Sequence, residues 1–146
     1  MSDNAIVART RWKVTAAALL LIIGAFHAAA APDQAHTAPY LGLLFGLNAA
    51  VAVALSAGVL IRPRTTWPLA AAYAAITLEL YLAARTVGLP ADHDTDWTDL
   101  PFGLPSVALE SMVVILYFGL SIWDGIRRDR QVAALHSRQR SHSAAR

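Results

Sequence analysis

Four blocks of apolar sequence, separated by short polar segments, constrain the fold of this chain more than any other feature. The blocks lie at residues 14–31, 40–61, 66–85 and 106–123, and each is about 18 to 22 residues long. A helix of that length rises about 1.5 Å per residue and can cross a hydrocarbon core of about 30 Å. Helices are expected because a backbone in lipid must satisfy its own hydrogen bonds. The sequence therefore predicts an all-α bundle of four transmembrane helices.

Composition and block boundaries divide the chain into three parts. Residues 1–13 form a polar N-terminal segment, residues 14–123 form one membrane domain, and residues 124–146 form a basic tail. Only 15% of the residues are charged, against about a quarter in soluble domains. The first block also fits a cleavable signal peptide, because a basic segment precedes it and alanines follow His27. Cleavage would leave three spans in the same orientation.

The basic residues are distributed unequally between the two sides of the predicted bundle. Eleven of the twelve lysines and arginines lie in the N-terminal segment, the second loop and the tail, and only Arg85 borders the other side. Positive charge is retained on the cytoplasmic side of a membrane. We therefore expect both termini in the cytoplasm and the first and third loops outside. The tail is expected to continue as a helix for a few turns and to contact anionic lipid; we expect no nucleic-acid partner.

A ridge of small residues follows one side of the second block at intervals of four. Such a ridge lets another helix approach closely, which is how helices associate in lipid. We therefore predict that it packs against another helix, within the chain, in a homo-oligomer or in a membrane-protein partner. The ridge consists of Gly42, Gly46, Ala50, Ala54 and Gly58.

Polar side chains lie at similar depth in the four blocks. His27 and Glu110 are about 6 Å below the outer ends of their spans. Glu79 is about 9 Å deep and Asn48 about 12 Å. Charged groups there cost several kcal/mol unless they are paired or hydrated, so we expect them to face the bundle. We predict that they meet Arg85 in one site, where Arg85 pairs with Glu110 and leaves Glu79 to His27 or to a ligand.

Three interpretations of this polar layer remain open. The first is a buried polar network in a structural, interaction or assembly protein. The second is a proton- or cation-handling cavity of a transporter or sensor subunit, because a carboxyl group in a low dielectric can exchange protons near neutral pH. The third is a transition-metal site, since imidazole and carboxylate ligands suit zinc, iron or manganese. The candidate metal ligands are His27, His36, Glu79, His93 and Glu110.

Several kinds of chemistry are excluded or disfavoured. The chain has no cysteine, which rules out thiolate nucleophiles and thiolate metal sites. The sequence has no nucleophile–base pair, phosphate loop or HExxH helix, so we predict no enzyme activity and no cofactor. Residues 92–96 begin like a calcium loop, but Trp97 and Gly103 stand where that loop requires glycine and glutamate.

The segment Arg85-Thr-Val-Gly-Leu-Pro90 at the end of the third span is the most specific part of a pattern that covers residues 14–123. In this pattern the chain resembles a group of small bacterial four-helix membrane proteins of uncharacterised function. Ala35 and Ala91 depart from the pattern, where relatives often have an acidic residue and a glycine. The resemblance implies a multi-pass protein of the bacterial cytoplasmic membrane, and it implies no activity. The other residues that carry it are His27, Pro32, Asp33, His36, Pro39, Tyr40, Asp96, Trp97 and Glu110.

Overall fold

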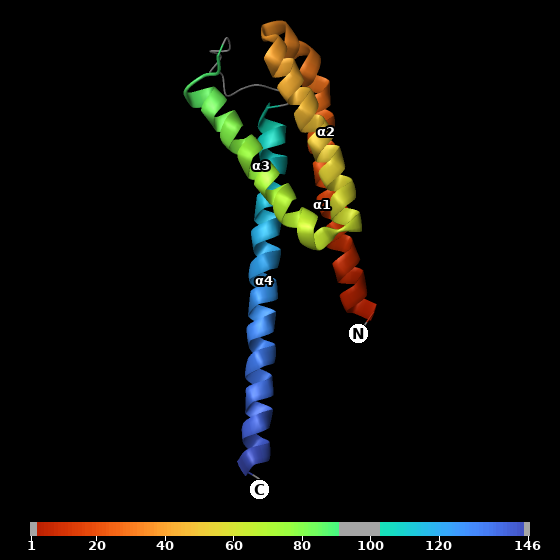
Figure 1. Ribbon diagram of the computed structural model, residues 1–146, viewed down its shortest axis with the longest axis vertical. Coiled ribbons are helices and arrows are strands. Elements are labelled where there is room, and N and C mark those ends of the chain that lie inside the picture. The colour runs from red at the N-terminus through yellow and green to blue at the C-terminus, as the bar shows by residue number, and fades with distance from the viewer. Residues whose placement is uncertain (1–2, 91–102, 145–146) are drawn as a thin grey trace.

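The computed structural model describes residues 3–90 and 103–144, which form four α-helices (Figure 1). They are α1 (Asp3–Thr37), α2 (Pro39–Ile61), α3 (Pro63–Thr86) and α4 (Gly103–Ala144). Each contains a segment long and apolar enough to cross a membrane. The predicted all-α fold with four membrane-spanning helices is therefore confirmed.

Single residues join the first three helices. Ala38 links α1 to α2, and Arg62 links α2 to α3. Each following helix begins with a proline, Pro39 or Pro63, whose fixed φ suits a first helical position and whose missing N–H is not needed there. Ala38 is extended, with φ −155° and ψ 134°, as expected for a residue that precedes proline.

Two helices extend further than the apolar blocks predict. The expected first loop, beginning at Pro32, is helical as far as Thr37, so α1 contains Pro32 and the loop shrinks to Ala38. A proline costs a helix one backbone hydrogen bond but does not always end it. The tail, expected to be helical for only a few turns, belongs to α4 as far as Ala144.

The Arg85-Thr-Val-Gly-Leu-Pro90 segment contains the residues that end α3. Gly88 has a φ of 83°, a conformation that glycine adopts without steric cost. The backbone N–H groups of Val87 and Gly88 both donate to the carbonyl of Ala83, at 2.9 and 3.2 Å. The following Pro90 accepts a hydrogen bond from the hydroxyl of Tyr40, at the start of α2. We call this end of the bundle the Pro90 end, and the opposite end the Arg62 end.

The α1–α2 hairpin is closely packed, and its two helices run side by side (Figure 1). Small residues let the helices approach. A Cβ added to Gly24 of α1 would lie 3.2 Å from the Cβ of Ala52 on α2. Nearby, the buried hydroxyl of Ser56 donates to the backbone carbonyl of Ala17 at 3.0 Å. Close backbones and a hydrogen bond between helices are the interactions that hold helices together in lipid.

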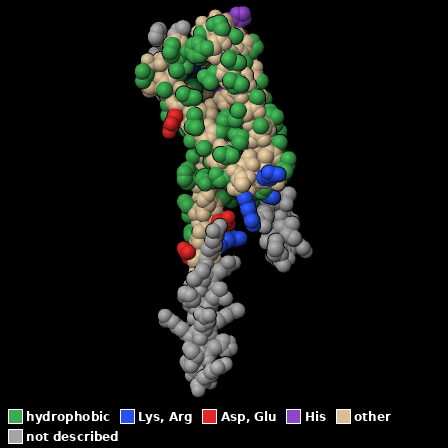
Figure 2. Space-filling view, in the orientation of Figure 1, with side chains coloured by type: hydrophobic (Ala, Val, Ile, Leu, Met, Phe, Trp, Pro, Cys, Tyr) green, Lys and Arg blue, Asp and Glu red, His purple; other side chains and the backbone are tan. Residues whose placement is uncertain are grey.

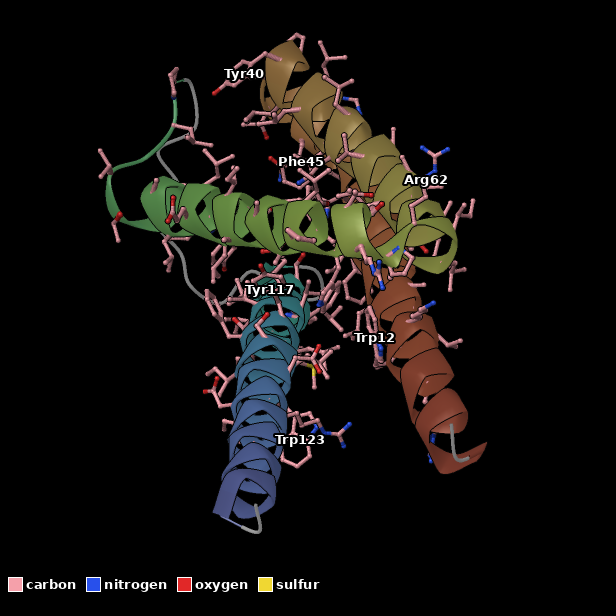
Figure 3. The ribbon with its side chains drawn as sticks, turned by 60° about the horizontal axis from the view of Figure 1, so that its bottom comes forward. Trp12, Tyr40, Phe45, Arg62, Tyr117 and Trp123 are labelled. Carbon is pink, nitrogen blue, oxygen red and sulfur yellow. The ribbon has the colours of Figure 1, made fainter. Side chains whose placement is uncertain are left out.

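The helix α3 diverges from α2 after Arg62 and crosses to α4 (Figure 1). Near the Arg62 end the helices share a core around Trp67. The Trp67 ring lies 5.4 Å from that of Trp12 and 6.0 Å from that of Tyr117, and these contacts join α1, α3 and α4. Figure 3 labels Trp12 on α1 and Tyr117 on α4. The buried core residues are Ala16, Leu20, Ile23, Val59, Trp67, Ala70, Ala74 and Val113.

Within the described chain, the small-residue ridge of α2 packs against other helices only at its two ends, so packing of its middle part against a second copy or a partner stays a prediction. Gly46 has nothing within 4 Å of an added Cβ, and Ala50 and Ala54 are exposed. Only the ends of the ridge make contact, Gly42 with Ala35 of α1 and Gly58 with Thr66 of α3. The reason is geometric, because a step of four residues turns about 400°, so the ridge winds around the helix.

The surface of the described residues has the character of a membrane protein. Large apolar side chains are exposed on all four helices, among them Leu21, Leu43, Leu69 and Ile115. Lysine and arginine side chains gather at the Arg62 end (Figure 2). On α4 the guanidinium of Arg127 lies 4.9 Å from the centroid of the Trp123 ring.

Candidate functional site

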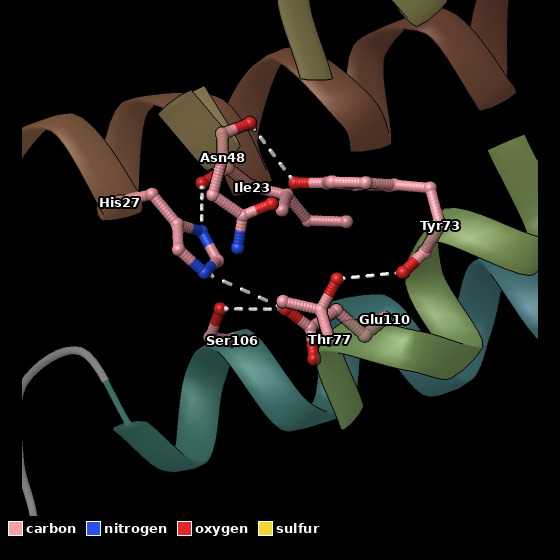
Figure 4. Close-up of polar contacts among 7 residues, drawn as sticks. All are labelled: Ile23, His27, Asn48, Tyr73, Thr77, Ser106 and Glu110. Carbon is pink, nitrogen blue, oxygen red and sulfur yellow. Dashed lines mark hydrogen bonds and ion pairs between the residues drawn. The ribbon is translucent and has the colours of Figure 1, made fainter. Parts of the chain in front are cut away.

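A histidine and a glutamate face each other inside the bundle, as Figure 4 shows. His27 of α1 and Glu110 of α4 are both buried, with 7% and 2% of their surfaces exposed. The Nε2 atom of His27 lies 3.9 Å from Oε1 of Glu110. The hydroxyl of Ser106, one turn earlier on α4, donates to the same oxygen at 3.3 Å. The distance between His27 and Glu110 is too long for a direct hydrogen bond.

The orientation of the His27 ring is fixed by its own helix. Its Nδ1 lies 2.9 Å from the carbonyl oxygen of Ile23. A carbonyl can only accept, so Nδ1 must carry a hydrogen, and in the neutral ring Nε2 is then the unprotonated nitrogen. The ring also lies 5.3 Å from that of Phe45, on the side of α2 that faces α3 (Figure 3). These contacts direct Nε2 toward Glu110.

A second group of polar side chains comes from α2 and α3 (Figure 4). The hydroxyl of Tyr73 donates to the backbone carbonyl of Asn48 at 3.3 Å, across the α2–α3 gap. The hydroxyl of Thr77 donates to the carbonyl of Tyr73 at 2.6 Å. Asn48, Tyr73 and Thr77 thus join the His27–Glu110 pair around one space.

That space is a cavity of about 830 Å³, lined by residues of all four helices. Its polar wall contains His27, Asn48, Tyr73, Thr77 and Glu110. The remainder is mostly apolar, supplied by leucine, isoleucine, valine, alanine and phenylalanine side chains of α1, α2 and α3. Ligand pockets typically combine such apolar walls with a few convergent polar groups.

The cavity opens between α2 and α3. Several of its lining residues are also exposed on the outside of the bundle: Leu44, Leu47 and Val51 on α2, and Leu69, Ile76 and Leu80 on α3. All of these lie within membrane-spanning segments. The residues at this opening are therefore of the kind that contacts the hydrocarbon of a bilayer, whereas Asp33, Gln34 and Arg85 line the cavity toward its Pro90 end.

The predicted assignment of partners differs from the one in the structure. Within the described residues, Glu110 meets His27 and Ser106 rather than Arg85. Arg85 is half-buried at the Pro90 end of the cavity, with its guanidinium 5.3 Å from the centroid of the Tyr81 ring. Glu79 is exposed and does not line the cavity. Two residues turn a helix by about 200°, so Glu79 lies across α3 from the buried Thr77.

The predicted metal ligands do not converge where the structure describes them. Among residues 3–90 and 103–144, no three His, Asp or Glu side chains lie close enough to hold a metal ion. His36 is exposed near the end of α1, about 13 Å along the helix from His27. His93, Asp96, Trp97 and the calcium-like segment at residues 92–96 lie outside the described residues.

Three site residues were not predicted from the sequence: Tyr73, Thr77 and Ser106. The buried positions of α3 lie on one stripe, with Ala71 beside a series at intervals of three and four residues that consists of Trp67, Ala70, Ala74 and Thr77. That spacing marks one helical face, and it could have identified Thr77 as inward-facing and Glu79 as outward-facing. An alanine-rich span obscures the pattern, because alanines occupy both faces.

Comparison of the chain with protein-family models, with curated proteins and with solved structures finds no match. The resemblance based on Arg85–Pro90 therefore stays a prediction, and the site is interpreted from its own geometry.

Proposed function

We propose that this four-helix membrane protein binds a lipophilic molecule, which enters its cavity from the bilayer between α2 and α3. The observation that carries the proposal is a cavity of about 830 Å³ whose opening is lined by exposed apolar residues of two membrane-spanning helices. This volume lies within the range of about 300–1,000 Å³ typical of ligand pockets. A polar wall inside an apolar entrance favours a mainly hydrocarbon ligand that carries one polar group.

The topology proposed for this function places both termini in the cytoplasm of a bacterial cell, with the Pro90 end of the bundle outside the cytoplasmic membrane. The proposal is supported by the position of eleven of the twelve lysines and arginines, which lie in the N-terminal segment, the second loop and the tail. Positive residues are retained on the cytoplasmic side. A green fluorescent protein fused after Arg146 is expected to fluoresce, and a periplasmic phosphatase inserted near Thr95 is expected to be active. The reverse pattern would contradict this topology.

The binding proposal is tested by what the protein retains on purification. The full chain is extracted in polymer-bounded nanodiscs and analysed by native mass spectrometry for a bound lipophile. Ala84 lines the cavity, so Ala84→Trp is expected to narrow it and to lower the bound mass. Leu43 is exposed on α2 outside the lining, and Leu43→Trp is the matched control that should retain it. Equal retention by wild type and both variants would contradict binding in the cavity.

A second candidate function, assembly with a membrane partner, is favoured by Glu79. Its carboxylate is exposed on α3, seven residues or about 10 Å along the helix from Thr86. A carboxylate that faces lipid at such depth is costly, so a partner helix with a hydrogen-bond donor would relieve it. The chain has no cysteine, so Leu82→Cys introduces a single cross-linking site on an exposed position of α3. If Leu82→Cys cross-links in membranes and the double variant Leu82→Cys, Glu79→Leu does not, the result would support assembly through this face. Cross-linking that is equal in the two variants would contradict it.

A further inference from the structure

We infer that the ligand of the cavity is a lipid alcohol, whose hydroxyl group binds between Nε2 of His27 and Oε1 of Glu110. This inference rests on the proposed function of the cavity and specifies the chemical class of the ligand. It is carried by the geometry of the pair and by the hydrogen-bonding roles of its two atoms.

The gap between the two atoms fits one bridging oxygen. At 3.9 Å, Nε2 and Oε1 are too far apart to bond each other directly. An oxygen placed about 2.8 Å from each atom would hydrogen-bond to both. Both residues line the cavity, so a molecule that enters between α2 and α3 can reach this gap.

The bridging group must donate one hydrogen bond and accept another. A net charge on the pair is costly inside the bundle, and two forms of the pair avoid it, imidazole with a carboxylic acid and imidazolium with a carboxylate. In the first form Glu110 donates and His27 accepts. In the second form His27 donates and Glu110 accepts. In both forms one atom offers a hydrogen and the other requires one.

This requirement discriminates among polar groups. A hydroxyl both donates and accepts, whereas an ether or a ketone only accepts and an ammonium group only donates. A ligand that leaves a buried hydrogen-bonding atom of the protein without a partner binds more weakly, because that atom has lost its water and gained nothing in return. Water also satisfies the pair, but water gains no favourable contact with the apolar side chains that line the rest of the cavity, such as Leu44, Leu47 and Ile76. A hydroxyl attached to a hydrocarbon satisfies both parts of the cavity.

The inference is tested with three photoreactive probes that share one sixteen-carbon chain bearing a diazirine. They are the primary alcohol, its methyl ether and the corresponding alkane. Full-length protein in phosphatidylcholine nanodiscs is irradiated with each probe at equal membrane concentration, and adducts are located by mass spectrometry. We expect the alcohol to label cavity residues such as Asn48 and Thr77 about tenfold more than the ether, which cannot donate and leaves one atom of the pair unpaired. The alkane forms neither hydrogen bond and should label them no more than the ether does.

Variants separate the role of the hydroxyl from that of protein shape. Glu110→Leu and His27→Phe each remove one partner and should lower labelling by the alcohol to the level of the ether. Glu110→Gln keeps a group that both donates and accepts, so it should retain the preference. Asp124→Leu removes an exposed carboxylate outside the lining and should behave as wild type.

The outcomes distinguish this inference from the proposed function. Equal labelling of Asn48 and Thr77 by all three probes would overturn the hydroxyl site and leave a cavity that binds lipophiles. Labelling confined to outward-facing residues such as Leu43 and Val53 would overturn both. The comparison of probes on wild-type protein decides the inference even where a variant fails to fold.

Discussion

The α1–α2 and α2–α3 hairpins are built alike and packed differently. Each turns at a single residue followed by proline, Ala38 before α2 and Arg62 before α3. The first hairpin is closed along its length, with Gly24 against Ala52. The second opens from its turn and encloses the cavity between its helices. The turn therefore does not determine whether two helices pack.

The side chains at each interface account for the difference. The α1–α2 interface contains Gly24, Ala52 and Ser56, whose small side chains allow backbone approach and a hydrogen bond between helices. The α2–α3 side presents large apolar side chains such as Leu47 and Ile76, which stand at the cavity opening. In lipid, apolar surface alone does not drive helices together, so this gap can persist when lipid or a ligand fills it.

The largest expected effect comes from a glycine in the closed hairpin. A Cβ at Gly42 would lie 2.4 Å from the Cβ and 2.9 Å from the Cα of Ala35, so the backbones must move apart. Gly42→Leu is expected to lower the free energy of unfolding by about 3 kcal/mol, measured by denaturation in detergent. Gly46→Leu is the matched control and should cost little, because nothing lies within 4 Å of its added Cβ. Equal losses would contradict the difference between the two glycines.

A smaller difference is expected for leucine truncation in the two regions. Leu20 is fully buried in the core, whereas Leu80 lines the cavity and is 46% exposed. Leu20→Ala should cost about 2 kcal/mol or more, since it leaves a void among packed neighbours. Leu80→Ala should cost less than about 0.5 kcal/mol, because lipid can replace the lost side chain. Thermal unfolding of both variants in the same detergent measures the comparison, and a larger loss at Leu80 would indicate that the cavity is closed.

The smallest expected effect concerns one hydrogen bond between α1 and α2. Ser56→Ala removes the donor to the carbonyl of Ala17 and should lower the free energy of unfolding by about 0.6 to 1 kcal/mol. Ser121 of α4 is exposed, so Ser121→Ala is the control and should leave stability unchanged. A stability loss at Ser121 that equals the loss at Ser56 would contradict the role of this bond.

The helices and their number could be predicted from the sequence because length and apolarity decide which segments span a membrane. The depth of His27 and Glu110 was also predictable, and the structure brings these two residues together. Rotation about the helix axis was harder to predict. Glu79 was expected to face inward because a charged group in lipid is costly. That cost does not fix the rotation of an alanine-rich helix, on which alanine marks no particular face, and Glu79 is exposed.

The cavity itself could not be predicted, because it depends on the angle between α2 and α3 rather than on any residue pattern. The same limitation applies to Gly46, which belongs to a ridge that winds around α2 away from α1. The predicted pairing of Glu110 with Arg85 was wrong because similar depth and opposite charge do not determine which side chains meet across the bundle. The geometry instead gives Glu110 a histidine at 3.9 Å and a serine on its own helix.

The central claim, that the α2–α3 gap admits hydrocarbon as far as the polar wall, is tested most directly by solid-state NMR in bilayers. Magnetisation is transferred from lipid acyl-chain protons to the isotope-labelled protein. The signal of the His27 ring is identified as the one that is missing from the spectrum of His27→Phe. We predict transfer to the His27 ring in the cavity and none to Ser56 in the α1–α2 interface. Transfer to the His27 ring from water alone, with no acyl-chain contribution, would contradict the claim.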